Sequence, residues 1–193
     1  MRRARIDRKT NETRVKVELD LDGAGRVAAK TPFPFLDHLV ASFGKHALID
    51  IKMSADSLDG IAHHLVEDVA IALGTALDKS LGKRDRIRRF GHAIVPMDDT
   101  RALAALDLVR RPYRQVVLKL ERQRLENLHR EDIEHFFRSL AEHMCACVHV
   151  VVQCGSNDHH KAEAAVKALA IALRQAAETD RGRKGPATTK GVM

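Results

Sequence analysis

Apolar and polar positions along this 193-residue chain form a pattern that occurs twice, once in each half. Residues 12–21 (ETRVKVELDL) and 99–108 (DTRALAALDL) alternate between apolar and polar side chains, as a half-buried strand does. Residues 36–48 and 133–144 have helical spacing and lead into the β-branched stretches IDIKM and CVHVVV. A second helix, rich in alanine and leucine, follows each stretch. The pattern therefore predicts the order strand, strand, helix, strand, helix in each half.

This repeat predicts an α+β fold that is built from a duplicated βαβα-type unit. Its two sheets and its helix layers would be related by a pseudo-twofold axis. We expect the first half to span residues 1–92 and the second half residues 93–182. Residues 183–193 would form a C-terminal tail that closes on the functional site as a lid.

Composition narrows the range of functions without selecting one. An apolar content of 45% is enough for a buried core. No stretch reaches about 18 uninterrupted apolar residues, and the N-terminus MRRARIDRK lacks an apolar signal segment, so we expect a cytoplasmic protein without membrane contact. The net charge of +7 fits a nucleic acid, a phosphorylated metabolite or a surface that meets other copies of the chain. One Tyr, six Phe and no Trp are too few for single-strand binding by base stacking. The three cysteines are expected to be free, buried thiols.

Each alanine-rich helix opens with a doubled histidine, within AHHLVED in the first half and DHHKAEA in the second. Side chains four residues apart share a helix face, so His63 with Glu67, and His159 with Glu163, can each grip one metal ion. The same residues could instead be polar groups at a helix start, where carboxylates interact favourably with the macrodipole. Two copies at matched spacing favour the metal interpretation.

Further histidines extend both motifs. His64 and His160 point about 100° away from the faces that bear the glutamates, so we expect them to reach a second ion across a symmetric or intersubunit boundary. His38 and His135 precede the doubled histidines by 25 and 24 residues. Imidazole and carboxylate without thiolate favour manganese over zinc or iron. The sequence thus predicts a dinuclear site with eight ligands: His38, His63, His64, Glu67, His135, His159, His160 and Glu163.

Short motifs along nearly the whole chain resemble one enzyme family. They are NET at 11–13, FLDH at 35–38, HHxxED at 63–68, RFG at 89–91, RP at 111–112, EHFF at 134–137, HHxxEA at 159–164 and TKG at 189–191. In this order they resemble the imidazoleglycerol-phosphate dehydratase family of histidine biosynthesis. The resemblance implies a ribosomal protein S5 domain 2-like fold, two Mn²⁺ ions per active site with the eight ligands named above, and a homo-oligomeric 24-subunit shell with active sites between subunits.

The chain departs from the family pattern at several positions. Ala62 and Leu65 stand where the family commonly has Asp and Thr, so a supporting carboxylate and a hydroxyl are missing beside the ligands. Asp99 replaces the usual Glu, Ala47 a Gly, and residues 109–110 the pair Ser-Gly. We expect these changes to affect rate and affinity more than the identity of the reaction.

The resemblance implies a carbon–oxygen lyase that dehydrates imidazole glycerol phosphate to the ketone imidazole acetol phosphate. The proton to be removed sits on a carbon with no adjacent carbonyl, so direct abstraction would give an unstabilised carbanion. Two metal ions on the ring nitrogens would hold the ring as imidazolate, which can expel the neighbouring hydroxyl and form a diazafulvene with an acidic C–H. Glu12 is the preferred base, its repeat partner Asp99 the second choice, and His46 a further catalytic candidate. Glu12 could also be a solvated carboxylate, and His46 a favourable charge at a helix end.

Positive side chains and hydroxyls are expected to hold the phosphate group. Arg89 and Arg111 match the arginines of the family's RFG and RP motifs, and a guanidinium suits phosphate. Lys167 lies one helical turn after Glu163 and could bind phosphate while the metals hold the ring. The tail residues Thr188, Thr189 and Lys190 resemble the family's closing segment.

Two other functions remain open from the sequence. A basic RNA-binding module would bind in a salt-sensitive way, although it has no use for paired HHxxE motifs. Another dinuclear-metal enzyme that acts on a phosphorylated metabolite, such as a phosphoester hydrolase, would release inorganic phosphate, whereas the dehydratase leaves the phosphate on its product.

Overall fold

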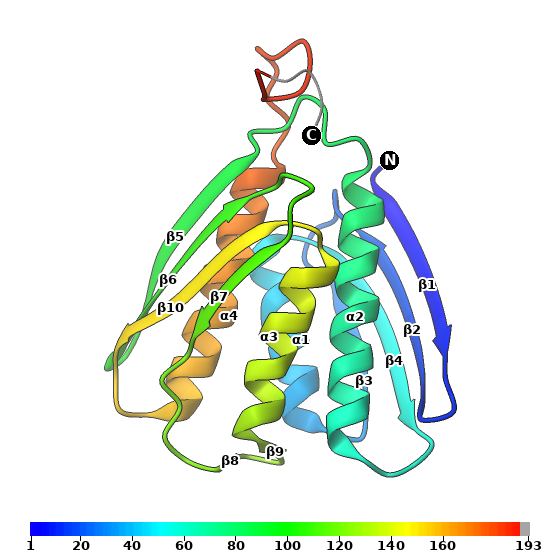
Figure 1. Ribbon diagram of the computed structural model, residues 1–193, viewed down its shortest axis with the longest axis vertical. Helices are drawn as coiled ribbons and strands as arrows, with labels where there is room; N and C mark the ends of the chain where they lie inside the picture. Colours follow the sequence, from blue (N-terminus) through cyan, green and yellow to red (C-terminus); the bar gives the residue numbers. More distant parts are fainter. Residues whose placement is uncertain (190–193) are drawn as a thin grey trace.

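The computed structural model describes residues 1–189 and contains two halves with a matching order of elements (Figure 1). The first half consists of β1 (Arg3–Lys9), β2 (Thr13–Asp20), β3 (Val27–Lys30), α1 (Pro34–Ala47), β4 (Asp50–Ser57) and α2 (Ala62–Leu81). The second half consists of β5 (Phe90–Met97), β6 (Thr100–Asp107), β7 (Tyr113–Val117), the short strands β8 (Arg124–Leu125) and β9 (Leu128–His129), α3 (Arg130–His143), β10 (Cys147–Cys154) and α4 (Asp158–Ala177).

Both halves form a four-stranded sheet with the same topology, in the orders β1-β2-β4-β3 and β5-β6-β10-β7. Neighbouring strands are antiparallel, except for the edge pairs β3–β4 and β7–β10, which are parallel. This arrangement confirms the duplicated α+β fold. The prediction of two strands before the first helix of each half was wrong, because β3 also precedes α1, and β7, β8 and β9 also precede α3. β3 and β7 have only 4 and 5 residues, and β8 and β9 have 2 each, too few for a clear alternating pattern.

The helices lie between the two sheets and cover their inner faces (Figure 1). Helix α2 packs on β1 and β2, and α4 packs on β5 and β6. Strand β2 shows why: its alternate residues Val15, Val17 and Leu19 are buried against the helices, whereas Arg14 and Glu18 face outward. Alternation in the strands and apolar helix faces thus produce one continuous core between the sheets.

Glycine at position 91 allows the close contact between α4 and β5. A Cβ atom added to Gly91 would lie 2.0 Å from the backbone oxygen of Ala172. Because this oxygen belongs to the backbone, no side-chain movement could relieve the clash. The RFG motif therefore has a packing role at its glycine.

The two ends of the helices carry different sets of the predicted site residues. The first turns of α1 and α4 meet, as do those of α2 and α3, so all the doubled histidines lie at one end, the lower end in Figure 1. Arg89 lies at the other end, where its backbone N–H donates to the carbonyl of Ala176 in the last turn of α4. A rise of 1.5 Å per residue places these ends of α4 about 25 Å apart.

Other expectations have different outcomes. The boundary between residues 92 and 93 stays a prediction; in the structure α2 ends at Leu81, and the first strand of the second sheet starts at Phe90. The cysteines are free, but Cys154 is exposed and Cys145 and Cys147 are half-buried, so the prediction of buried thiols was wrong. Within residues 1–189, none of the helices combines the length and apolar character needed to cross a membrane.

Candidate metal centres and catalytic residues

One group of predicted ligands forms where α1 meets α4. His38 from α1 and His159 and Glu163 from α4 place one ligand atom each within 4.8 Å of one another. The Nε2 atoms of both histidines lie 3.3 Å from Glu163 Oε2. The group lines an open pocket of about 580 Å³, together with Phe35 and Glu126. Its donors are therefore both convergent and accessible.

The second group is its pseudo-symmetric counterpart, where α2 meets α3. His63 and Glu67 from α2 and His135 from α3 again place three ligand atoms within 4.8 Å of one another. His135 Nε2 lies 3.2 Å from Glu67 Oε1. This nitrogen is buried and forms no hydrogen bond among the described residues, so its close approach to the Glu67 carboxylate is its contact at this site.

Both groups fit a divalent metal ion. Each offers two imidazole nitrogens and one carboxylate oxygen, a donor set without thiolate that suits a borderline-hard cation. Three protein donors leave coordination positions for a further ligand and for substrate. The sequence-predicted pairing of each glutamate with the histidine four residues earlier is thus present in the geometry.

His64 and His160 do not join these groups. His64 Nδ1 lies 2.6 Å from Asp59 Oδ2 and 3.8 Å from Glu12 Oε2. His160 Nδ1 lies 2.9 Å from Asp99 Oδ1. Within one chain, therefore, six of the eight predicted ligands come together in two groups, and the remaining two point elsewhere.

A carboxylate faces the Nδ1 atom of each doubled histidine. Besides the contacts of His64 and His160, His63 Nδ1 lies 2.8 Å from Asp132 and His159 Nδ1 lies 3.3 Å from Glu126. A carboxylate that accepts the Nδ1–H bond leaves the Nε2 lone pair free for a metal. Sequence reasoning missed Asp132 and Glu126 because they come from distant segments, and it also missed Asp59, which precedes His64 by five residues. The carboxylate that faces His63 comes from Asp132 of α3.

The two candidates for the catalytic base, Asp99 and Glu12, differ in their hydrogen bonds. Asp99 accepts hydrogen bonds from the backbone N–H groups of Ser156 and Asn157 and from the Ser156 hydroxyl. These donors and His160 hold the pKa of Asp99 far below its usual range, which makes it a weak base. Glu12 is half-exposed and its carboxylate lies beside His64. The geometry favours Glu12.

His46, the third catalytic candidate, lies in the last turn of α1 near Glu163 and Lys167. Partial burial, followed by the positive charge of Lys167, lowers its pKa. Lys167 Nζ lies 2.8 Å from Glu163 Oε1, so this candidate for phosphate binding is adjacent to the first metal group. The metal group, the lysine and the neutral imidazole therefore occupy one region.

The other predicted phosphate-binding residues lie at the opposite end of the helices. Arg89 is largely buried and pairs with Asp107 at 2.6 Å, while it also donates to the carbonyl of Ala187 in the tail. Arg111 is exposed in the connection between β6 and β7, and this connection begins where Asp107 of β6 pairs with Phe90 at the start of β5. Thr188 and Thr189 follow Ala187, and Lys190 lies outside the described residues. One chain does not bring this end to its own metal groups.

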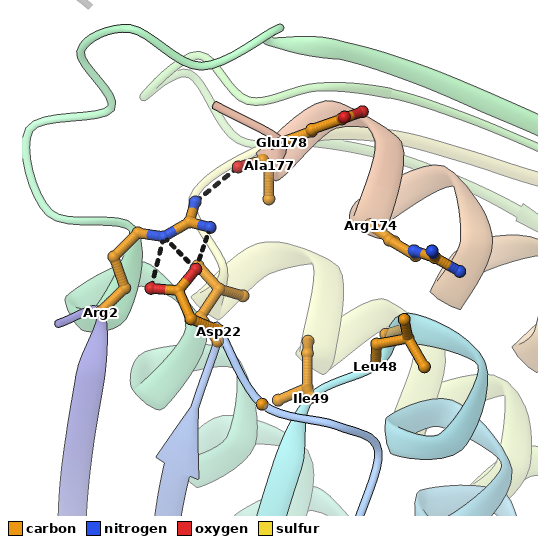
Figure 2. Close-up of a pocket in the computed structure, with 10 residues that line it drawn as sticks. Arg2, Asp22, Leu48, Ile49, Arg174, Ala177 and Glu178 are labelled. Carbon is orange, nitrogen blue, oxygen red and sulfur yellow. Dashed lines mark hydrogen bonds and ion pairs between the residues drawn. The ribbon is translucent and has the colours of Figure 1, made fainter. Parts of the chain in front are cut away.

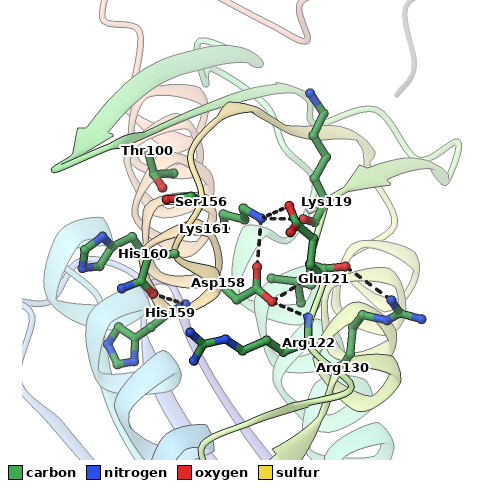
Figure 3. Close-up of polar contacts among 12 residues, drawn as sticks. Thr100, Lys119, Glu121, Arg122, Arg130, Ser156, Asp158, His159, His160 and Lys161 are labelled. Carbon is green, nitrogen blue, oxygen red and sulfur yellow. Dashed lines mark hydrogen bonds and ion pairs between the residues drawn. The ribbon is translucent and has the colours of Figure 1, made fainter.

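A buried lysine that sequence reasoning did not identify secures the first turn of α4 (Figure 3). Lys161 is 1% exposed, and its ammonium donates to Lys119 O at 2.8 Å, Asp158 Oδ1 at 2.9 Å and Glu121 Oε1 at 3.1 Å. Asp158 Oδ2 accepts the backbone N–H groups of Glu121 and Arg122. The network fastens residues 119–122, and so the segment leading to Glu126, against the metal-binding helix.

A second pocket, of about 350 Å³, lies at the far end of α1 and α4 and contains none of the predicted site residues (Figure 2). There Arg2 bonds with Asp22 and with the carbonyl of Ala177, which ties the N-terminal strand to the end of α4. We therefore assign these contacts of Arg2 a role in stability and none in the proposed site.

The duplicated fold and its two histidine–carboxylate groups define an α+β protein with two candidate metal centres, and comparisons identify its family. The family model described as imidazoleglycerol-phosphate dehydratase matches residues 31–173. Imidazoleglycerol-phosphate dehydratase from Chloroherpeton thalassium is 44% identical over 193 residues, covering 100% of this chain and 98% of the relative. That from Methanothermobacter thermautotrophicus is 45% identical over 194 residues, with the same coverage.

Solved structures agree with this assignment. Imidazoleglycerol-phosphate dehydratase from Pyrococcus furiosus, in complex with (S)-C348, matches with a TM-score of 0.84 and 34% identity, covering 97% of this chain and 100% of that one. The Staphylococcus aureus enzyme matches with a TM-score of 0.81 and 26% identity, covering 91% and 98%. The chain belongs to the imidazoleglycerol-phosphate dehydratase family, the hydro-lyases of histidine biosynthesis.

Proposed function

We propose that the protein converts imidazole glycerol phosphate to imidazole acetol phosphate with two divalent metal ions, preferably manganese. The observation that carries this proposal is the pair of equivalent groups, His38 with His159 and Glu163, and His63 with His135 and Glu67. Such ions would bind the ring nitrogens of the substrate and lower the pKa of the ring, so that the ring can expel the adjacent hydroxyl.

Residues of the chain then have distinct roles around the substrate. Glu12 accepts the proton from the carbon next to the one that loses its hydroxyl, and the resulting enol becomes the ketone. Lys167, 2.8 Å from Glu163, supplies positive charge beside the first metal group. Arg89, Arg111, Thr188, Thr189 and Lys190 are proposed to hold the phosphate from a neighbouring chain, because Arg89 lies about 25 Å from the metal groups of its own chain.

An assembly of several chains, with the 24-subunit shell as the specific proposal, would complete the site. His64 and His160 point away from the two metal groups, so they are available to ions shared with a neighbour. The outer face of the second sheet supports association as well. A row of apolar side chains crosses its four strands in register and consists of Ile94, Leu103, Val151 and Val117. The outer face of the first sheet carries charged residues instead.

The assay that tests the reaction follows ketone and inorganic phosphate together after incubation with manganese and imidazole glycerol phosphate. Ketone without free phosphate supports dehydration. Release of phosphate would support the alternative of a dinuclear hydrolase. Salt-sensitive RNA binding without turnover of this substrate would support the basic RNA-binding module. A Glu67→Gln, Glu163→Gln double variant is the matched control, because it keeps side-chain volume but weakens both metal groups.

Assembly has its own test. Neutral imidazoles bind metals, so a chelator, or a pH below about 6.5, should strip the ions. Sedimentation should then show a large particle with manganese, smaller particles after chelation, and recovery when manganese returns. A large particle that persists without metal would show that protein contacts alone hold the chains together. A cytoplasmic location remains part of the proposal.

A further inference from the structure

A buried carboxylate next to the metal group has no part in the chemistry described so far. Asp68 follows Glu67 on α2 but is only 5% exposed and faces β1 and β2. The Nε and Nη2 atoms of Arg8 each lie 2.8 Å from Asp68 Oδ1. The hydroxyls of Thr13 and Thr10 donate to Asp68 Oδ2, the latter at 3.4 Å. Asp68 therefore binds both sides of the turn that joins β1 to β2.

That turn carries the proposed base. Thr10 closes it, because the Thr10 hydroxyl accepts the backbone N–H groups of Glu12 at 3.1 Å and Thr13 at 3.0 Å. The carbonyl of Glu12 accepts the N–H of Leu58 at 2.7 Å. With its backbone held on both sides, Glu12 directs its half-exposed carboxylate toward His64.

The second half has a different arrangement at the corresponding place. Where the first half has the carboxylate, the arginine and the threonine that closes the turn, the second half has Ala164, Val95 and Met97. The carboxylate that corresponds to Glu12 is Asp99, and it is bound by Ser156 and Asn157. A buried carboxylate costs desolvation energy and is tolerated when its hydrogen bonds are satisfied. The anchor formed by Asp68, Arg8 and Thr10 is therefore present only in the first half, which carries the proposed base Glu12.

We propose that Asp68 is a positioning residue, which fixes the turn of residues 10–13 so that Glu12 meets the substrate at the correct distance. This inference rests on the proposed function of Glu12. Asp68 itself touches neither substrate nor metal. Its effect is on the rate of proton removal, because displacement of a reacting group by about 1 Å can lower a rate 100-fold.

The test compares Asp68→Asn in two backgrounds, the parent and Glu12→Ala, with kcat, KM and bound manganese measured for each. In the parent we expect kcat to fall about 10- to 100-fold, while KM and manganese content stay within about twofold. In Glu12→Ala, we expect no further fall, because the group being positioned is absent. If Asp68→Asn leaves kcat of the parent unchanged, or lowers kcat equally in both backgrounds, the role of Asp68 is refuted while the proposed function stands. Full activity of Glu12→Ala would overturn the assignment of the base, and the inference with it.

Two further pairs of variants keep the test decisive if Asp68→Asn does not fold. Thr13→Val removes the hydroxyl while it preserves the shape of the side chain, and Thr13→Ser restores the hydroxyl. Arg8→Met removes the guanidinium from a side chain that is 38% exposed, and Arg8→Lys restores a positive charge. The first member of each pair should lower kcat, and the second should recover most of it. Equal kcat within both pairs would contradict the anchor.

Discussion

The buried Lys161 network provides a quantitative test of how charge is accommodated beside the metal-binding helix. The side chains of Lys161 and Asp158 are 1% and 2% exposed. The repeat places Leu65 and Ala62 at the corresponding positions of the first half. The perturbation is therefore Lys161→Leu alone, and Lys161→Leu combined with Asp158→Ala, which copies the pair found in the other half.

The expected magnitudes follow from the hydrogen bonds. Lys161→Leu removes three contacts and leaves the buried Asp158 Oδ1 without its cation, which should cost about 3–5 kcal/mol of unfolding free energy. For a chain of this length that corresponds to a lowering of Tm by roughly 6–20 °C. The double variant leaves no buried charge. It removes the acceptor of two N–H groups, those of the exposed Glu121 and Arg122, which water can replace, so the cost should be about 1–2 kcal/mol.

Thermal unfolding followed by circular dichroism measures both values. Equal protein concentrations and excess chelator are needed, because bound metal and association both raise Tm. The double variant should be more stable than the single variant. A single variant within about 1 kcal/mol of the parent, or a double variant as unstable as the single one, would refute the reasoning.

Three other predictions test the site and the loops. Glu67→Gln and Glu163→Gln should each lower bound manganese by about half in elemental analysis, and unchanged content with full activity would contradict the ligand assignment. Arg111→Lys should raise KM about 10-fold with metal content intact, because the bidentate fork is lost; an unchanged KM would remove Arg111 from the site. Hydrogen bonds from Arg26 hold the pKa of Asp50 below its usual range, so its contribution to stability is present above about pH 4 and lost as pH falls through its folded pKa. The difference in Tm between the parent and Asp50→Asn should accordingly shrink on acidification from pH 7 to pH 2, and a constant difference would contradict this.

Periodicity explains which parts of the site could be predicted from sequence. Two residues four apart on a helix must share a face, so the pairing of His63 with Glu67 needs no tertiary information. The internal repeat then supplied His38 and His135 as matching candidates, and the structure brings each to the histidine–glutamate pair of the other half, which the repeat did not indicate. The direction of His64 followed from the same helix geometry.

Other features depend on contacts between distant segments, which periodicity does not contain. Asp132 approaches His63 from another helix, and Glu126 approaches His159 from a loop, so neither was recognised in the sequence. The sequence could not show that Lys161 is buried, since a lysine at a helix start usually extends into solvent. The position of Arg89 required knowing that the end of α4 lies beside the start of β5.

The two halves together explain how duplication can produce a catalytic site. Their symmetry supplies two similar histidine–carboxylate groups, which match the two ring nitrogens of the proposed substrate. Proton removal, however, requires one base on one side of the substrate, and a symmetric molecule would offer two. The halves differ at this place: Asp99 accepts hydrogen bonds from N–H donors, whereas Glu12 lies beside His64 on a turn that Asp68 holds. In the proposed mechanism this difference between the halves selects Glu12 over Asp99 as the base, which the symmetric metal groups alone could not do.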